Sequence, residues 1–396
     1  MDFATVRDLE IRGRRVLVRV DFNVPLDGTR VTDDTRIRAA LPTLQYLLDG
    51  GASVILMSHL GRPKGRPEAK YSLKPVADRL AEVLGRPVQM ASDCVGPEVE
   101  AQARALQPGG VLLLENVRFH DEETANDPGF ARQLAALGDL YVNDAFGSAH
   151  RAHASTTGVA EYLPSAAGLL MEKELAELGG LLAHPEAPFV VLLGGAKVGD
   201  KIGVLENLIG RADRILIGGG MAFPFLKARG LEIGRSLCDE DLEVPRRIEE
   251  KARGTRTQLL LPVDVVVATE FAEGAPNRPA AVEEIPADMM GLDIGPRTVE
   301  LFRAELAGSR TIFWNGPMGV FEKKPFDVGT RAVAQAVADS GARSVVGGGD
   351  SVAALEQAGL ADRITHVSTG GGASLEFVEG RLLPGVEALK RRALHS

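Results

Sequence analysis

Four strand-like runs in the first half of this 396-residue chain are each followed by polar or cationic residues. The carboxyl ends of parallel strands meet at one edge of a sheet, where α/β proteins usually bind their ligands. Neighbouring strands lie about 5 Å apart, so side chains at that edge can converge. Guanidinium groups match phosphate oxygens with paired hydrogen bonds. We therefore expect a site for a small, highly anionic ligand, built by Arg36, Arg62, Arg118 and Arg151.

Other polar residues of these loops allow two interpretations when taken one at a time. Asp21 and Asn23 could hydrogen-bond a hydroxy acid, or they could form an Asx turn at the end of the first strand. The loop that begins with His59 could bind an oxyanion or could be a solvated basic loop. His150 and His153 could share a helix face as metal ligands, but no acidic or cysteine partner stands at a ligand spacing, which disfavours a metal site.

The second half has a lysine- and glycine-rich turn, GGAKVGDKIG, directly after the apolar run FVVLL. A strand that passes through such a turn into a helix presents free N–H groups to anions, and Lys197 and Lys201 add positive charge. The turn is not a Walker A motif, because Asp200 stands where the lysine should follow and Ile202 replaces Ser or Thr. The turn therefore predicts a phosphate site that is not a P-loop.

Further glycine clusters follow later strand-like runs. Gly348, Gly349, Asp350 and Ser351 begin a helix-like run, so their amides could hold phosphates and Asp350 could meet a magnesium ion. A tight turn with aspartate as helix N-cap explains the same residues equally well. Glu322 ends a rigid loop and could bind a ribose hydroxyl pair.

The order of these runs predicts the fold. Strand-like and helix-like segments alternate throughout, which is typical of parallel sheets covered by helices. The length exceeds the size at which one core usually stops growing, so we expect two doubly wound, Rossmann-like parallel-sheet domains joined by a hinge helix. The predicted parts are residues 1–170, the hinge helix 171–187 and residues 188–374.

Composition excludes several classes of protein. The formal net charge is −9, which disfavours a general nucleic-acid binder. No run approaches 18 apolar residues, so we expect no membrane span. Cys94 and Cys238 are far apart in the sequence, and neither has a metal-ligand spacing, which favours a reducing, cytoplasmic location.

The assembled segments resemble the phosphoglycerate kinase family. The matching runs occur in the family's order from near Val16 to about Ser374, and they are VRVDFNVP, SHLGRPKG, LLENVRFH, VNDAFGSAHRAHAS, GGAKVGDKI, LLPVDVVVA, GLDIGP, WNGPMGVFE, GGGDS and STGGGAS. The resemblance implies a glycolytic-type enzyme that transfers the acyl phosphate of 1,3-bisphosphoglycerate reversibly to Mg-ADP, giving 3-phosphoglycerate and Mg-ATP. It also implies a hinge-bending monomer whose segment from about 375 to 396 packs back on the first domain.

The resemblance assigns roles to residues. Arg36 and Lys197 would be catalytic, flanking the phosphoryl group in transfer, and Asp350 would hold Mg²⁺. The 3-phosphoglycerate site would consist of Asp21, Asn23, Arg36, His59, Arg62, Arg118 and Arg151. The nucleotide site would consist of Lys201, Gly291, Glu322, Gly348, Gly349, Asp350 and Ser351.

The chemistry agrees with this assignment, because the attacking carboxylate in the reverse reaction is already ionised and needs no general base. Two rivals remain. A carboxylate-activating ligase would need a third-substrate site, for which no motif is present. A scaffold protein that had lost catalysis is disfavoured by the presence of Arg36, Lys197, Lys201 and Asp350.

Overall fold

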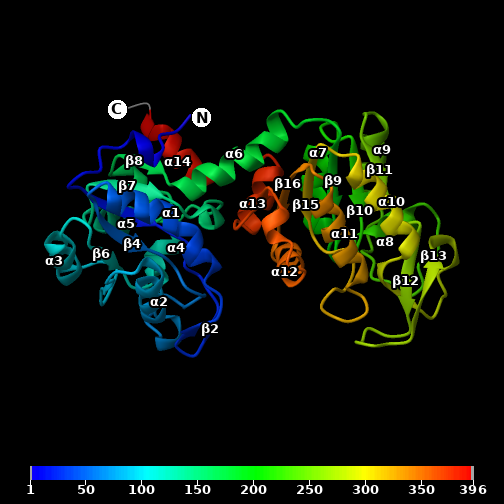
Figure 1. Ribbon diagram of the computed structural model, residues 1–396, viewed down its shortest axis with the longest axis horizontal. Coiled ribbons are helices and arrows are strands. Elements are labelled where there is room, and N and C mark those ends of the chain that lie inside the picture. The colour runs from blue at the N-terminus through cyan, green and yellow to red at the C-terminus, as the bar shows by residue number, and fades with distance from the viewer. Residues whose placement is uncertain (1, 394–396) are drawn as a thin grey trace. The chain divides into compact units, whose positions relative to one another are not determined.

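The structure is a computed structural model that describes the backbone of residues 2–393 and the side chains of residues 2–390. The chain divides into two compact units (Figure 1). Unit 1 consists of residues 1–176 and 382–396, and unit 2 consists of residues 177–381.

Unit 1 is built on a six-stranded sheet in the order β5-β6-β4-β1-β7-β8, and every strand pair in it is parallel. Helices and short 3₁₀ turns connect these strands, as a parallel sheet requires. The four strands predicted from apolar runs are confirmed. The strands are β1 (Arg15–Arg19), β4 (Ser53–Met57), β5 (Gln89–Met90), β6 (Val111–Leu113), β7 (Leu140–Asn143) and β8 (Ser165–Ala167). The α-helices that lie wholly in this unit are α1 (Thr35–Asp49), α2 (Lys74–Leu84), α3 (Pro97–Ala105), α4 (Asp121–Thr124), α5 (Pro128–Ala135) and α14 (Pro384–Ala393).

Unit 2 repeats this plan with the sheet β11-β10-β9-β15-β16-β17, again with parallel pairs. Its strands are β9 (Phe189–Leu193), β10 (Arg214–Ile217), β11 (Gln258–Leu260), β15 (Thr311–Asn315), β16 (Arg343–Gly347) and β17 (His366–Val367). Its helices include α7 (Ile202–Leu208), α8 (Ala222–Ala228), α9 (Glu243–Arg253), α10 (Pro296–Ala307), α11 (Val328–Asp339), α12 (Gly349–Gln357) and α13 (Gly372–Val378). Two mainly parallel sheets flanked by helices confirm the predicted α/β class.

The apolar run QLLLPVDVVVA predicts a single strand from the sequence, and this prediction is wrong. The run forms two strands in different sheets, because β11 ends at Leu260 and β12 (Asp264–Ala268) belongs to a second, antiparallel sheet. In that sheet β12 lies between β13 (Asn277–Ala281) and β14 (Met290–Ile294). Pro262 explains the break, since proline has no N–H with which to continue a strand ladder.

The chain leaves unit 1 through helix α6 (Leu169–Ala183), which contains the division between Ala176 and Glu177. It returns after Arg381, somewhat later than the predicted return at about residue 375. The reason is that α13 lies against α7, where Asn207 Nδ2 donates to Val378 O at 2.7 Å. Helix α14 then packs in unit 1, where Gly385 N donates to Ala149 O at 2.8 Å.

A buried carboxyl group holds the first turn of α6. Asp144 Oδ1 accepts hydrogen bonds from Leu170 N at 3.0 Å and from Met171 N at 3.3 Å. Asp144 is 1% exposed, and this burial raises its pKa to about 7. The folded chain therefore holds this proton more tightly than the unfolded chain does.

Replacing Asp144 with asparagine should flatten the pH dependence of stability. The protonated Asp144 stabilises the fold fully below the unfolded pKa of 3.8, and this contribution is lost as the pH rises through about 7. Between pH 5 and pH 8 the wild type should lose on the order of 2 kcal/mol that Asp144→Asn does not lose. Urea unfolding of the wild type and of Asp144→Asn at pH 5 and pH 8 tests this. If the unfolding midpoint changed equally with pH in both proteins, the prediction would be contradicted.

Candidate functional site

The four predicted arginines of unit 1 are close enough to influence the same groups. Arg36 and Arg118 both contribute to the electrostatic environment of His59. Arg62 and Arg151 both contribute to that of Arg118. The structure therefore brings these residues together beyond the carboxyl ends of β1, β4, β6 and β7, and we call them the cationic cluster.

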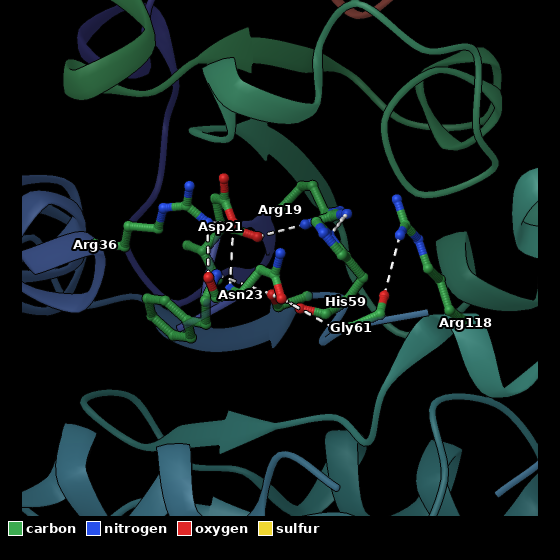
Figure 2. Close-up of polar contacts among 10 residues, drawn as sticks. Arg19, Asp21, Asn23, Arg36, His59, Gly61 and Arg118 are labelled. Carbon is green, nitrogen blue, oxygen red and sulfur yellow. Dashed lines mark hydrogen bonds and ion pairs between the residues drawn. The ribbon is translucent and has the colours of Figure 1, made fainter. Parts of the chain in front are cut away.

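The loop after β1 positions Arg36. Arg36 Nη1 donates to Asn23 O at 2.6 Å and forms an ion pair with Asp21 Oδ1 at 3.6 Å (Figure 2). Asp21 Oδ1 also accepts from Asn23 N at 3.2 Å, so the Asx turn predicted as one alternative is present. Asn23 Oδ1 in turn accepts from Gly61 N at 2.9 Å, which joins this loop to the loop after β4. Asp21 and Asn23 thus shape the cluster.

Arg118 has hydrogen-bonding capacity and charge that the protein itself does not satisfy. Its Nη1 donates to Gly61 O at 3.1 Å, and its Nε is buried without a hydrogen-bond partner. Burial first, and then the positive charge of Arg19, lower the pKa of Arg118 to about 10. A guanidinium held in such surroundings gains from an incoming phosphate or carboxylate.

The histidines of this region are poor metal ligands. Burial and the charges of Arg118, Arg19 and Arg151 lower the pKa of His153 to about 4. A metal cation at His150 and His153 would meet the same positive field. Within residues 2–390 a three-residue group with metal-ligand geometry occurs elsewhere, at Asp93, Cys94 and His120.

That trio is already satisfied by hydrogen bonds. Asp93 Oδ1 accepts from His120 Nε2 at 2.7 Å, if the proton is on that nitrogen, and from Cys94 N at 2.7 Å. Burial, and then the charge of Asp93, raise the pKa of the Cys94 thiol well above its ordinary value, which keeps the sulfur protonated.

Sequence reasoning missed a cationic residue that lies beside the cationic cluster. Arg19, the last residue of β1, is fully buried and lies next to His59. Its signal was present in the run VLVRV, where a charged residue interrupts a series of apolar residues.

Unit 2 contains a cavity of about 510 Å³. Three of the predicted nucleotide residues, Gly291, Glu322 and Asp350, line it, together with apolar side chains such as Phe223, Val265 and Met318. A mostly apolar pocket with a few polar groups suits a planar base with polar substituents. Gly348, Gly349, Ser351, Lys197 and Lys201 are absent from its lining.

The remaining predicted residues lie on the turns beside this cavity. Lys201 Nζ donates to Asn315 Oδ1, a partner that sequence reasoning did not identify. Burial lowers the pKa of Lys201, against the opposing charges of Asp200, Asp350 and Glu379. Lys197 is exposed and precedes the 3₁₀ turn Val198–Lys201.

The start of α12 offers ligands for phosphates. Gly348 is its N-cap, with φ of 92°, and Asp350 lies exposed in the first turn. Ser351 is fully buried, and its Oγ accepts from Gly316 N at 2.7 Å, which ties the start of α12 to the loop after β15. Asp350 lines the cavity and forms no ion pair among the described residues, so its carboxylate fits a magnesium ion that also binds nucleotide phosphates.

Comparisons with known proteins agree on one family. A family model described as phosphoglycerate kinase matches residues 6–381. The chain is 63% identical over 393 residues to a phosphoglycerate kinase of Rubrobacter xylanophilus, covering 99% of each chain. It is 60% identical to one of Moorella thermoacetica, covering 98% of this chain and 99% of the relative. The chain belongs to the phosphoglycerate kinase family.

Solved structures of the phosphoglycerate kinase family share this fold over its whole length. The phosphoglycerate kinase from Coxiella burnetii matches with a TM-score of 0.91 at 43% identity, covering 100% of both chains. That from Pyrococcus horikoshii matches with a TM-score of 0.83 at 34% identity, covering 99% of both. The predicted family, the predicted enzyme class of kinase and the predicted fold are confirmed.

A glycine of the kinase's cavity gives a direct test of the nucleotide site. A Cβ on Gly291 would lie 2.3 Å from Phe223 Cζ, and Phe223 lines the same cavity. In Gly291→Ala the ring must move within a closely packed wall, so we expect about tenfold weaker ADP binding by calorimetry.

The matched control is Gly308→Ala, because a Cβ on Gly308 would lie 3.9 Å from its nearest neighbour, Ala304 O, and Gly308 is in none of the predicted sites. This variant should bind ADP as the wild type does. If both variants bound ADP with wild-type affinity, the nucleotide base would not occupy this cavity.

Proposed function

We propose that the chain catalyses reversible transfer of the acyl phosphate of 1,3-bisphosphoglycerate to Mg-ADP, giving 3-phosphoglycerate and Mg-ATP. The observation that carries the proposal is the cationic cluster, in which Arg36 and Arg118 act on His59, Arg62 and Arg151 act on Arg118, and Arg118 Nε has no partner. Such a cluster suits a ligand with several negative charges, as both phosphoglycerates are.

The substrate phosphate and carboxylate bind in unit 1. Arg62, Arg118 and Arg151 contribute guanidinium groups, and Arg36, which follows β1, contributes a fourth. Asp21 and Asn23 accept hydrogen bonds from the substrate hydroxyl while they fix the loop geometry. His59 adds a hydrogen-bond donor.

The nucleotide binds in unit 2. Its base enters the cavity beside Gly291, and Glu322 accepts from the ribose hydroxyls. Its phosphates meet Lys201 and the amides of Gly348, Gly349 and Ser351 at the start of α12. Asp350 holds Mg²⁺, which when bound neutralises phosphate charge.

The transfer requires alignment and positive charge more than acid–base catalysis. Lys197 and Arg36 flank the phosphoryl group. In the reverse direction the carboxylate of 3-phosphoglycerate attacks the γ-phosphorus of ATP without a general base, the bond from that phosphorus to the bridging oxygen breaks, and ADP leaves. The donor and the acceptor bind to different units, so the proposal requires the units to close during turnover, with α6 as the hinge, and to exclude water that would hydrolyse the acyl phosphate.

A coupled assay with purified protein, 3-phosphoglycerate and Mg-ATP tests the proposal. We expect ADP formation that depends on 3-phosphoglycerate and is lost when magnesium is chelated. ATP consumption that required an added amine or thiol would instead indicate a carboxylate-activating ligase. No turnover, with intact binding of both substrates, would indicate a scaffold.

We further propose that the protein acts as a monomer in the cytoplasm and uses only small-molecule substrates, without nucleic acid or membrane. No helix of the described chain has the length and apolar character needed to cross a bilayer. Light scattering during size-exclusion chromatography tests the oligomeric state, and a mass near 42.1 kDa is expected.

A further inference from the structure

A fully buried arginine lies beneath the cationic cluster. Arg19 ends β1, which lies between β4 and β7 in the unit 1 sheet, and its side chain has no exposed surface. Arginine stays charged at every physiological pH and can only donate hydrogen bonds. The role of Arg19 therefore depends on which groups accept its hydrogen bonds.

Arg19 has three acceptors of different kinds. Its Nε donates to Ser155 Oγ at 2.8 Å, and its Nη1 donates to the carbonyl oxygen of Val20. Its Nη2 lies 2.9 Å from His59 Nδ1. Figure 2 draws the two side chains next to each other. Together these contacts hold the plane of the guanidinium against the edge of the imidazole ring.

The negative charge that balances Arg19 is on Glu123, and the hydroxyl group of Ser155 lies between the two side chains. Ser155 Oγ donates to Glu123 Oε2 at 2.7 Å, and Ser155 N donates to Glu123 Oε1 at 2.7 Å. Glu123 is fully buried, so this carboxylate balances Arg19 without competing for the atom that contacts His59. The relay leaves Arg19 fixed in one orientation.

The contact with His59 determines where the imidazole proton is. Arginine cannot accept a hydrogen bond, so His59 Nδ1 must be the acceptor and must carry no proton. A neutral imidazole then has its proton on Nε2. No hydrogen bond in the described part of the chain uses His59 Nε2, so this N–H is available to a ligand.

The groups around His59 oppose a second proton. They are Arg19 on β1, Arg36 on α1, Arg118 after β6 and His153 after β7. Burial, followed by these positive charges, lowers the pKa of His59 well below its ordinary value. The ring is thus neutral in the same field that attracts the substrate.

We propose that Arg19 is a positioning residue that locks His59 as the neutral Nε2–H tautomer, so that His59 meets the substrate as an uncharged donor. The last clause rests on the proposed function, because it places His59 in the substrate site. The tautomer itself is a property of the free protein and is tested without substrate.

The first experiment is ¹⁵N nuclear magnetic resonance of histidine side chains in the ligand-free full chain, with His59 assigned from a His59→Gln sample. We expect an unprotonated Nδ1, a protonated Nε2 and no titration of His59 between pH 5 and pH 8. A protonated Nδ1, or titration near pH 6.5, would overturn the lock.

The second experiment compares two amides at position 59. In His59→Gln an amide N–H can reach the position of Nε2, whereas in His59→Asn it reaches only that of Nδ1. Because a hydrogen bond to a charged ligand contributes substantially, 3-phosphoglycerate should bind about tenfold more weakly to the Asn variant than to the Gln variant.

Equal losses in both variants would show that a cation or the ring itself is needed, and would overturn the role of an uncharged donor. If 3-phosphoglycerate did not bind the wild type, the proposed function would be wrong. The ¹⁵N experiment would still test whether Arg19 fixes the tautomer of His59, because it uses no substrate. Arg19→Met supplies a further check where it folds, since His59 should then populate both tautomers.

Discussion

Replacing Lys197 with alanine should lower kcat about 10²- to 10³-fold while leaving ADP affinity within a few-fold of the wild type. Lys197 is exposed and has no hydrogen bond or ion pair among the described residues. Its ammonium group therefore contributes little to the resting fold and is free to meet charge that develops on the phosphoryl oxygens. An interaction made only in the transition state changes kcat and kcat/KM together.

The control for this variant is Lys251→Ala, which removes an exposed lysine of the same unit that donates to Glu206 O. Its kinetics should match those of the wild type. An unchanged kcat in Lys197→Ala would remove this lysine from the transfer step. A loss of ADP affinity as large as the loss of kcat would make it a nucleotide-binding residue instead.

Replacing Arg118 with methionine should weaken the binding of 3-phosphoglycerate and increase the stability of the free protein. Truncating one partner of a partly buried, hydrogen-bonded charge pair typically weakens binding by at least a factor of about a hundred, so 3-phosphoglycerate affinity should fall by that order. The free protein should become more stable by about 1 kcal/mol, because methionine removes a guanidinium whose pKa is already depressed to about 10. Calorimetry and thermal unfolding measure the two effects.

Arg151→Ala separates the two effects, since Arg151 belongs to the same cluster but is exposed. We expect it to weaken 3-phosphoglycerate binding without a gain in stability. If Arg118→Met lowered the melting temperature, the cost of burying the Arg118 charge and its repulsion in the cationic cluster would not be the dominant influences on this side chain. If it kept wild-type affinity, the substrate would bind elsewhere.

The longer strands could be predicted because buried parallel strands are continuous apolar runs. The runs RVLVRVDF and FVVLL became β1 and β9 for this reason. The strands β5 and β17 have two residues each and were missed, since so short a run carries no periodic signal. The antiparallel sheet was missed because Pro262 was read as part of one strand, and because β13 is mostly exposed.

The cationic cluster could be predicted in part because residues that follow parallel strands share one edge of a sheet. Partners inside the fold could not be predicted in this way. Arg19 and Glu123 meet through Ser155, and these residues are separated by 32 or more positions. Asn315 likewise reaches Lys201 across 114 positions, which only the order of strands in space determines.

The return of the chain to unit 1 has a consequence for its synthesis on the ribosome. Unit 2 is one continuous stretch, whereas the core of unit 1 is completed by residues that follow unit 2 in the chain. These are Leu383, which precedes α14, and Val386 and Leu389 in α14, and all three are buried. Residues 1–176 are synthesised before unit 2, but their packing is complete only after the residues that follow Arg381 have also been synthesised. Unit 2 can therefore be fully synthesised while the core of unit 1 still lacks its contacts with Leu383, Val386 and Leu389.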